Sequence, residues 1–240
     1  MQTTRNYLKK MTHWLLPHAC VLCGGYSTRQ QDLCKSCLDE LPILESACSR
    51  CAKPFLAGEQ LLLCDICINE TPLFDCTHAL YFYQFPITRL IMDLKFGDAL
   101  ANARILGELL ADKIQTEWYR EKILPEALIP LPLHPNRIKQ RGFNQALEIS
   151  RPIVKRLKLP LLYNNCLRIK HTSAQATLPA MERQQNVKNA FTIAKNIPYK
   201  HIAVLDDVIT TGHTMMEFCR VLKQAGVKQI DVWCCARPVL

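Results

Sequence analysis

After residue 75, the spacing of apolar positions changes repeatedly between the patterns of strands and of helices. Short apolar runs predict strands at 78–85, 127–134, 165–170, 189–194, 201–206 and 229–236. Between these runs, apolar residues recur three and four positions apart and predict helices at 98–119, from 144 onward and at 214–226. Strands separated by helices form a mostly parallel sheet with right-handed crossovers. We therefore expect an α/β fold, in which helices flank a mostly parallel sheet.

Two residues bear on the helix that follows residue 143. Asn144 is a good N-cap, because its side-chain oxygen can accept hydrogen bonds from the first free amides of a helix. Pro152 removes one amide from the interior of the same helix. We therefore expect this helix to be kinked or divided in two.

The first 75 residues follow a different pattern, in which cysteines recur in C-x2-C pairs. The four pairs lie within 48 residues and are Cys20 and Cys23, Cys34 and Cys37, Cys48 and Cys51, and Cys64 and Cys67. Each pair presents two thiolates to one metal, and two pairs complete a tetrahedron of soft ligands that suits Zn²⁺. Thioredoxin-like redox motifs, which do not occur four at a time, and iron–sulfur clusters are the alternatives. The spacing predicts two zinc sites, formed by consecutive or by interleaved pairs. Because cysteine fills every coordination position, their role is structural or binding rather than catalytic.

Length and composition agree with a small zinc-ribbon module at 1–75 that precedes a domain of ordinary size at 76–240. The chain has 240 residues and lacks both a signal-peptide pattern and an uninterrupted apolar run of transmembrane length. We therefore expect a cytoplasmic protein. In that reducing compartment, its 13 cysteines are better explained as metal ligands and buried thiols than as disulfides.

The apolar run at 201–206 ends on polar residues that a core does not need. The segment VLDDVITTGHT places Asp206 and Asp207 at the end of a strand and a hydroxyl-rich turn before a helix. Ligands bind beyond the carboxyl ends of parallel strands, and the amides of a helix N-terminus cradle phosphate. The carboxylates could accept hydrogen bonds from sugar hydroxyls or hold Mg²⁺ through water. Together these features indicate phosphoribosyl pyrophosphate, and the alternative is a capping aspartate with a plain strand-to-helix linker.

The same segment resembles the ribose-phosphate signature of type I phosphoribosyltransferases, and further motifs resemble the ComF family. These motifs are the cysteine pairs, KFGD at 95–98, PLHPNRIKQRGFNQA at 132–146, and the spaced residues Gln175, Arg183, Asn186 and Phe191. The resemblance implies the phosphoribosyltransferase fold behind a zinc ribbon. It also implies a role in natural competence, together with other proteins of the competence machinery, after DNA has entered the cytosol as a single strand.

Carried over position by position, the resemblance implies a ligand site. Asp206 and Asp207 would hold the ribose hydroxyls, and Mg²⁺ would accompany the ligand. The 5′-phosphate would lie on Thr210, Thr211, Gly212, His213 and Thr214. Pyrophosphate would meet the loop after the strand at 127–134 through His134, Arg137, Arg141 and Asn144. Residues 170–183 would form a mobile loop that closes over the site.

Two departures from the phosphoribosyltransferase pattern bear on catalysis. Thr210 stands where purine salvage enzymes place an acid that assists the incoming base, and a threonine hydroxyl has no useful acid–base chemistry near neutral pH. The sequence also ends a few residues after its last strand, without a long segment to roof a nucleobase pocket. Because no acceptor follows from these residues, an active phosphoribosyltransferase of nucleotide salvage is the alternative to a role in DNA uptake.

Basic residues gather in the middle of the larger domain. Residues 130–200 carry a net charge of +11, whereas the whole chain carries +9. Such a surface attracts phosphates, including a nucleic-acid backbone, with an affinity that falls steeply with salt. The candidate nucleic-acid contacts are Arg137, Lys139, Arg141, Lys155, Arg156 and Lys158. We expect single-stranded DNA as a partner, and the alternative is an ordinary solvated face.

Overall fold

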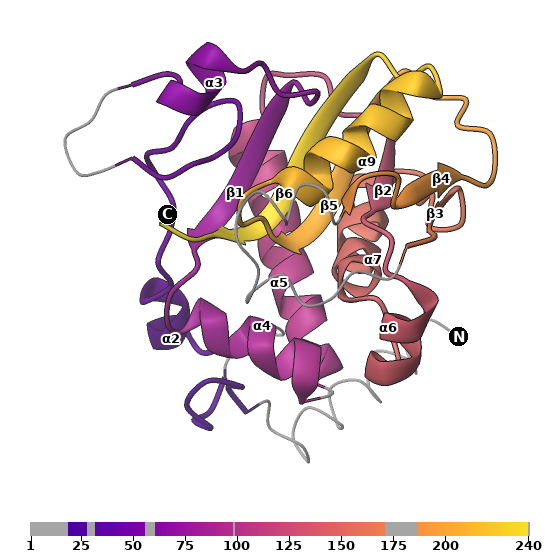
Figure 1. Cartoon of the computed structure of the whole chain (residues 1–240). Coiled ribbons are helices and arrows are strands. Elements are labelled where there is room, and N and C mark those ends of the chain that lie inside the picture. The colour runs from indigo at the N-terminus through magenta and orange to yellow at the C-terminus, as the bar shows by residue number, and fades with distance from the viewer. Residues whose placement is uncertain (1–18, 28–31, 56–60, 98, 171–186, 240) are drawn as a thin grey trace, which may run out of the picture.

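A computed structural model of the chain describes residues 19–27, 32–55, 61–97, 99–170 and 187–239 (Figure 1). Four parallel strands form the central sheet in the order β1-β6-β5-β2. Their bounds are β1 Cys76–Phe82, β2 Ala127–Pro130, β5 His201–Val208 and β6 Gln229–Arg237. The expected parallel sheet is therefore confirmed. The two shorter predicted strands, β3 Cys166–Arg168 and β4 Phe191–Ile193, pair with each other in a separate antiparallel sheet.

Among the described residues after Phe82, helices account for most of the regular structure outside the strands. They are α4 Ile87–Phe96, α5 Leu100–Lys113, the π-helix η1 Ile114–Trp118, α6 Pro135–Arg141, α7 Gln145–Leu157 and α9 His213–Gln224. The predicted helix at 98–119 corresponds to α5 and η1 together. α4 was not predicted from the sequence, and the segment of α6 was expected to be a loop. Both helices border the site described below.

The sheet separates two apolar clusters, because neighbouring residues on a strand point to opposite faces. On β5, Ala203 and Leu205 pack with α4, α5 and α7, whereas Ile202 and Val204 pack with α9. The polypeptide thus forms three layers with β5 fully covered on both faces. This burial explains why the segment at 202–205 is continuously apolar.

α7 continues through Pro152 as one helix and is not divided there. Asn144 caps it as predicted, since its Oδ1 accepts a hydrogen bond from the amide of Ala146 at 3.0 Å. Next to the proline, Gly107 of α5 lies so close that an added Cβ would be 2.4 Å from Pro152 Cγ and 2.3 Å from the carbonyl oxygen of Ile149. A glycine is therefore required where these two helices cross.

The cysteine-rich module lies against the edge of the sheet at β1. Its short helices are α2 Lys35–Asp39 and α3 Asp65–Asn69. The amide of Leu44 donates to the carbonyl of Leu80 at 3.0 Å, and the amide of Phe82 donates to that of Pro42 at 2.9 Å. These backbone hydrogen bonds join the module to the sheet. Within the described ranges, no helix is long and apolar enough to span a bilayer.

Candidate functional site

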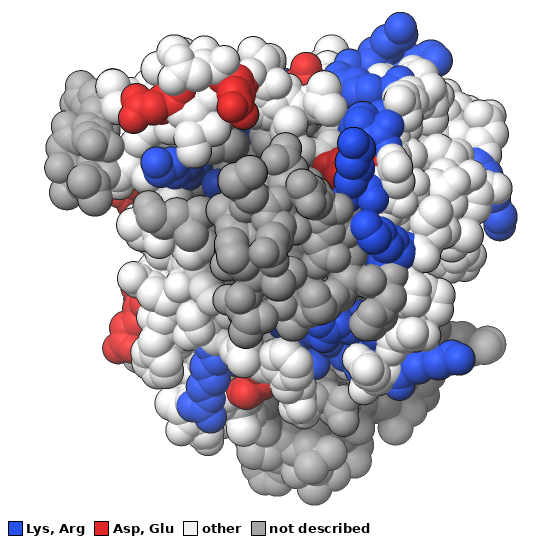
Figure 2. All heavy atoms as spheres, in the orientation of Figure 1, with Lys and Arg blue, Asp and Glu red and all other residues white. Residues whose placement is uncertain are grey.

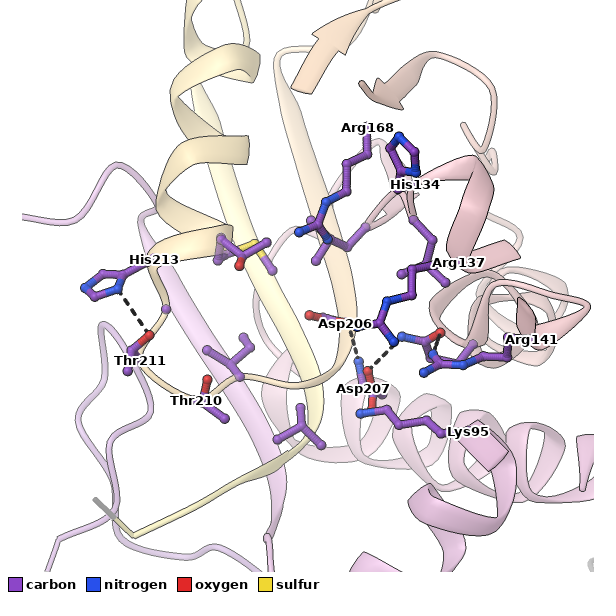
Figure 3. A pocket seen from close by; sticks show the side chains of 18 of the residues that line it. Lys95, His134, Arg137, Arg141, Arg168, Asp206, Asp207, Thr210, Thr211 and His213 are labelled. Carbon is purple, nitrogen blue, oxygen red and sulfur yellow. Dashed lines mark hydrogen bonds and ion pairs between the residues drawn. The ribbon is translucent and has the colours of Figure 1, made fainter. Parts of the chain in front are cut away.

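A cavity of about 450 Å³ opens at the carboxyl ends of β2 and β5 (Figure 3). Its walls come from α4, from α6 with the turn before it, from β3, and from the turn that joins β5 to α9. This is the edge of the sheet at which parallel α/β folds bind ligands. The predicted acidic pair and the predicted phosphate turn both line it.

Asp206 and Asp207 differ in their surroundings although they are adjacent. Asp207 is only 2% exposed, forms an ion pair with Lys95 of α4, and accepts a hydrogen bond from Nε2 of Gln145 of α7 at 3.2 Å. Asp206 accepts a hydrogen bond from the backbone amide of Asp207 at 2.9 Å and lines the cavity. The buried member of the pair is thus held by two helices, while Asp206 remains available to a ligand.

The charges of this cluster are coupled. Burial, and then the neighbouring charge of Asp207, raise the pKa of Asp206 well above its usual range, although Lys95 opposes this. Burial would lower the pKa of Lys95, but the charge of Asp207 and the hydrogen bond to it raise that pKa above its ordinary value. Lys95 therefore stays protonated at neutral pH and offsets part of the negative charge of the pair.

The turn at 209–212 leads from β5 into α9. Gly212 is the N-cap of α9 and has φ +83°, a left-handed conformation that glycine adopts without strain. Oγ1 of Thr211 and Nδ1 of His213 lie 3.3 Å apart, at the end of the turn remote from Asp206 (Figure 3). We call residues 209–214 the phosphate loop, because they lead into and begin a 12-residue helix whose N-terminus favours an anion.

A buried arginine at the end of β6 holds the start of the phosphate loop. Nη1 of Arg237 donates to the carbonyl oxygen of Ile209 at 2.6 Å and also to that of Thr210. Arg237 is 5% exposed and was not among the predicted site residues. The carbonyls at this position therefore point down into the protein.

A basic wall faces the acidic pair. Arg137 and Arg141 come from α6, Arg168 comes from β3, and Figure 3 shows the guanidinium groups of Arg137 and Arg168 directed toward Asp206. Burial lowers the pKa values of Arg141 and Arg168. The guanidinium of Arg141 also lies 5.4 Å from the ring centre of Phe96. A ligand in the cavity would therefore meet cations opposite the carboxylates.

The other two predicted pyrophosphate contacts have capping roles in the structure. Nδ1 of His134 accepts from the amide of Asn136 at 3.2 Å and so caps α6, while the residue still lines the cavity. Asn144 caps α7, and its Nδ2 donates to the carbonyl of Leu131 at 3.0 Å. Asn144 is not among the residues that line the cavity. The proposed closing loop at 170–183 lies, after Lys170, outside the described residues.

The candidate nucleic-acid residues fall into two groups. Arg137, Lys139 and Arg141 lie on α6 at the cavity, whereas Lys155, Arg156 and Lys158 lie at the far end of α7. Arg156 pairs there with Asp112 of α5 and also contacts Gln115. In the view of Figure 2, Lys and Arg gather on the half that carries α9 and α6, and most Asp and Glu lie on the half that carries the cysteine module. The structure thus supports a basic surface beside the cavity but not one continuous patch of all six residues.

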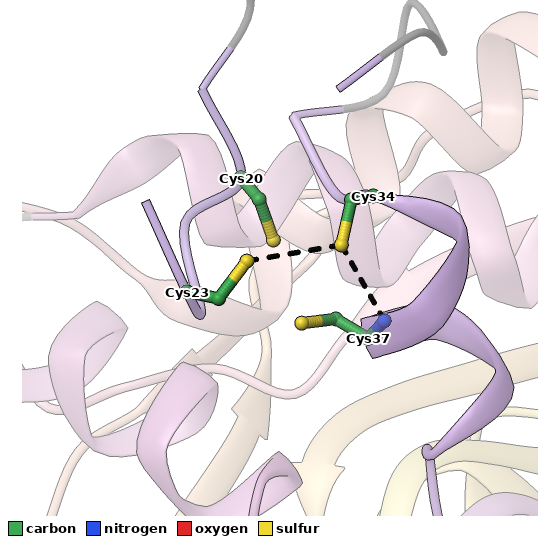
Figure 4. Close-up of side chains that lie close together, drawn as sticks. All are labelled: Cys20, Cys23, Cys34 and Cys37. Carbon is green, nitrogen blue, oxygen red and sulfur yellow. Dashed lines mark hydrogen bonds between the residues drawn. The ribbon is translucent and has the colours of Figure 1, made fainter. Parts of the chain in front are cut away.

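The eight predicted cysteine ligands form two separate clusters of consecutive pairs. One contains Cys20, Cys23, Cys34 and Cys37 (Figure 4), and the other contains Cys48, Cys51, Cys64 and Cys67. Sγ of Cys23 is 3.8 Å from Sγ of Cys34, and Sγ of Cys51 is 3.6 Å from Sγ of Cys64. Four sulfurs about 2.3 Å from one Zn²⁺ would be about 3.8 Å apart. Both clusters therefore fit structural zinc, and the interleaved alternative is excluded.

Two protein-family models match the chain. The double zinc ribbon domain matches residues 11–69, and the phosphoribosyl transferase domain matches residues 144–238. These matches agree with the cysteine clusters and with the parallel sheet. The predicted fold class is therefore confirmed.

Three relatives match over most of their length. Competence protein F of Haemophilus influenzae is 35% identical over 223 residues, which cover 91% of this chain and 96% of that protein. The DNA utilization protein YhgH of Salmonella typhi is 29% identical over 226 residues, or 93% of this chain and 99% of that protein. Competence protein ComFC of Bacillus subtilis is 26% identical over 205 residues, or 82% of this chain and 80% of that protein.

Proposed function

Because the chain belongs to the competence protein F family, we propose that it acts in natural transformation as a cytosolic protein that handles incoming single-stranded DNA and binds phosphoribosyl pyrophosphate. The names of the relatives support the first part, since they are competence and DNA utilization proteins. The match to the phosphoribosyl transferase domain supports the second part. The basic residues beside the cavity support a nucleic-acid ligand.

One observation carries the ligand assignment: carboxylates, a phosphate loop and arginines line the same cavity. A phosphorylated pentose needs hydrogen-bond acceptors beside its sugar hydroxyls and hydrogen-bond donors beside its phosphate groups. Asp206 and Asp207 accept from the ribose hydroxyls, and the amides of the phosphate loop donate to the 5′-phosphate. Arg137 and Arg168 across the cavity bind the pyrophosphate through charge-assisted hydrogen bonds.

A divalent cation fits the same residues. Asp206 and Asp207 offer the oxygen ligands that Mg²⁺ prefers, and the ion would supply charge neutralisation for the pyrophosphate. Lys95 already pairs with Asp207, so Asp206 is the carboxylate with the greater freedom to hold the metal.

The cavity offers less to an acceptor than to the phosphoribosyl ligand. Among the described residues that line it, Asp206 and Asp207 are the only carboxylates, and both belong to the ribose site. Thr210 stands at the loop position where purine salvage enzymes place an acid that assists the incoming base. Its side chain is a hydroxyl and has no titrating group. We therefore favour binding in the service of DNA handling. An active pentosyltransferase is the second candidate, because the acidic pair and the phosphate loop are both present in this cavity.

Isothermal titration with phosphoribosyl pyrophosphate and Mg²⁺ tests the ligand assignment. We expect saturable binding that weakens by 100-fold or more when Asp206 and Asp207 are both changed to asparagine, because two charge-assisted hydrogen bonds contribute about 1.5–3 kcal/mol each. Asp112→Asn, on the surface of α5, is the matched control and should leave the affinity unchanged. Absence of binding by the unmodified protein would contradict the proposal. Pyrophosphate release in the presence of a panel of nucleobases would instead establish the second candidate.

A further inference from the structure

We infer that Arg237 is a positioning residue that couples the second cysteine cluster to the phosphate loop, so that zinc bound by Cys48, Cys51, Cys64 and Cys67 sets the phosphate affinity of that loop. The inference rests on the proposed function to the extent that the loop binds phosphate. The coupling itself is a property of the protein without ligand and can be measured separately.

The guanidinium of Arg237 bonds to both parts. Nη1 donates to the carbonyl oxygens of Ile209 and Thr210 in the phosphate loop, and Nε donates to the carbonyl oxygen of Ala52 at 3.4 Å. Ala52 directly follows the ligand Cys51. A planar guanidinium has a fixed geometry of donors, so a displacement of one carbonyl shifts the donors that hold the others.

The turn from Cys48 to Ala52 sets the direction of the carbonyl group of Ala52. Ala52 has φ +55°, is 2% exposed, and donates its amide to the carbonyl of Cys48 at 2.8 Å. A left-handed alanine costs about 1 kcal/mol or more and persists only where its surroundings enforce it. Zinc held by the cysteines on both sides of this turn would enforce it, because the metal fixes the positions of Cys48 and Cys51.

Packing joins the same two regions. Ala52 belongs to the apolar cluster that also contains Ile209 and Met215, and Cys51 packs against this cluster. The first cysteine cluster packs elsewhere, since Cys20 belongs to the cluster on the opposite face of the sheet, and Cys34 and Cys37 pack against that cluster. In the described part of the chain, no backbone-to-backbone hydrogen bond joins the first cluster to residues 209–214. The two zinc sites therefore differ in their connection to the loop, and the first serves as an internal control.

Arg237 also contributes charge beneath the loop. Among the described residues its hydrogen bonds go to carbonyl oxygens, and no carboxylate forms an ion pair with it. A buried cation without a counter-ion favours an anion nearby, and the loop residues Ile209 and Thr210 that Arg237 holds also line the cavity. The same residue thus fixes the loop and favours the negative ligand.

Hydrogen–deuterium exchange of residues 209–214 in the zinc-loaded full-length protein measures the coupling. Cys51→Ser removes a ligand of the second cluster, and Cys34→Ser removes one of the first. We expect Cys51→Ser to increase the exchange rate of the 209–214 amides at least tenfold, and Cys34→Ser to leave it within twofold. Metal analysis should show that each variant has lost one zinc. Equal effects of the two variants would overturn the inference.

Arg237→Gln and Arg237→Lys test the positioning residue with both cysteine clusters intact. We expect both variants to retain two zincs and a cooperative unfolding transition, while the 209–214 amides exchange faster and phosphoribosyl pyrophosphate binds at least tenfold more weakly. Arg237→Lys should recover little of the slow exchange and of the ligand affinity that Arg237→Gln loses, because lysine lacks the planar set of donors. Unchanged exchange in both arginine variants would overturn the inference. If the unmodified protein binds no phosphoribosyl pyrophosphate, the proposed ligand is wrong, and the exchange rates still decide whether the coupling exists.

Discussion

Lys95 of α4 forms an ion pair with Asp207 at the end of β5, and the side chain of Asp207 is only 3% exposed. A motif that shows two adjacent acids in the sequence is therefore a mixed cluster of two carboxylates and one ammonium group in the fold. The ligand-free cavity consequently carries less negative charge than the sequence alone indicates.

Removal of the buried cation should destabilise the protein. Lys95→Met leaves the carboxylate of Asp207 buried without its partner, and breaking a buried pair in this way costs about 3–5 kcal/mol. We expect a decrease toward the lower end of this range in the free energy of unfolding from urea titration, because the lysine side chain is 19% exposed. Arg151→Met is the control, since the Arg151–Glu148 pair is more exposed and should contribute less than about 1 kcal/mol. Equal effects of the two variants on the free energy of unfolding would show that the Lys95–Asp207 pair contributes no more to stability than an exposed pair does.

Replacing Asp206 should separate stability from function. Its pKa is raised in the folded protein, so the folded state binds this proton more tightly than the unfolded state does. The free energy of unfolding should therefore decrease as the pH rises from about 4 through the raised pKa. Asp206→Asn should remove this dependence and stabilise the ligand-free protein at pH 7 by about 1 kcal/mol, while ligand binding is lost. Thermal unfolding at pH 5 and pH 8 measures both effects, and a lower melting temperature of the variant at pH 8 would contradict this view of the site.

Gly107→Ala should separate α5 from α7. The added Cβ would lie 2.3 Å from a backbone oxygen of α7, which cannot rotate away as a side chain can. We expect a destabilisation of about 1–3 kcal/mol or more, measured by denaturant titration. Gly25→Ala, where an added Cβ would lie 3.3 Å from Sγ of Cys23, provides the comparison. A Gly107→Ala variant as stable as the unmodified protein would mean that the helices can move apart freely.

The basic residues of α6 should determine DNA affinity. Binding of a short single-stranded oligonucleotide, followed by fluorescence anisotropy, should weaken with salt, and the slope against log salt should fall by about 0.7 for each phosphate contact that is removed. Arg137→Glu should lower both the affinity and the slope. Arg151→Glu changes the charge equally on an exposed position of α7 and should have a smaller effect. Salt-independent binding, or equal effects of the two reversals, would contradict the role of this surface.

The strands and the acidic pair were predictable because they depend on local pattern. β5 is buried on both faces and therefore appears in the sequence as a continuous apolar run that ends at the ligand edge. α4 was missed although Ile87, Leu90, Ile91 and Leu94 are all buried at helical spacing. That pattern would have placed Lys95 on a helix, but only the packing of α4 against the sheet reveals that its ammonium group meets Asp207.

The partners of the cysteines and of Arg237 were beyond the reach of sequence spacing. Consecutive and interleaved pairs both satisfy a tetrahedral metal, so the choice depends on the path of the chain between the turns. Arg237 follows an apolar strand, where a lone arginine usually lies at the surface. Its burial depends on three carbonyls, two from the phosphate loop and one from Ala52, which the sequence does not show to be neighbours.

The order of the strands has a consequence for synthesis of the protein. β6 is the last strand along the chain, yet it lies between β1, the first, and β5. Until β6 has left the ribosome, β1 has no partner strand in the sheet. The apolar side chains of β1 and β5 also lack the strand that packs between them. Each cysteine cluster, in contrast, is assembled from fewer than 21 consecutive residues and can bind its metal during translation. A ribosome stalled before residue 229 would therefore hold a chain with formed zinc knuckles and an open, aggregation-prone sheet.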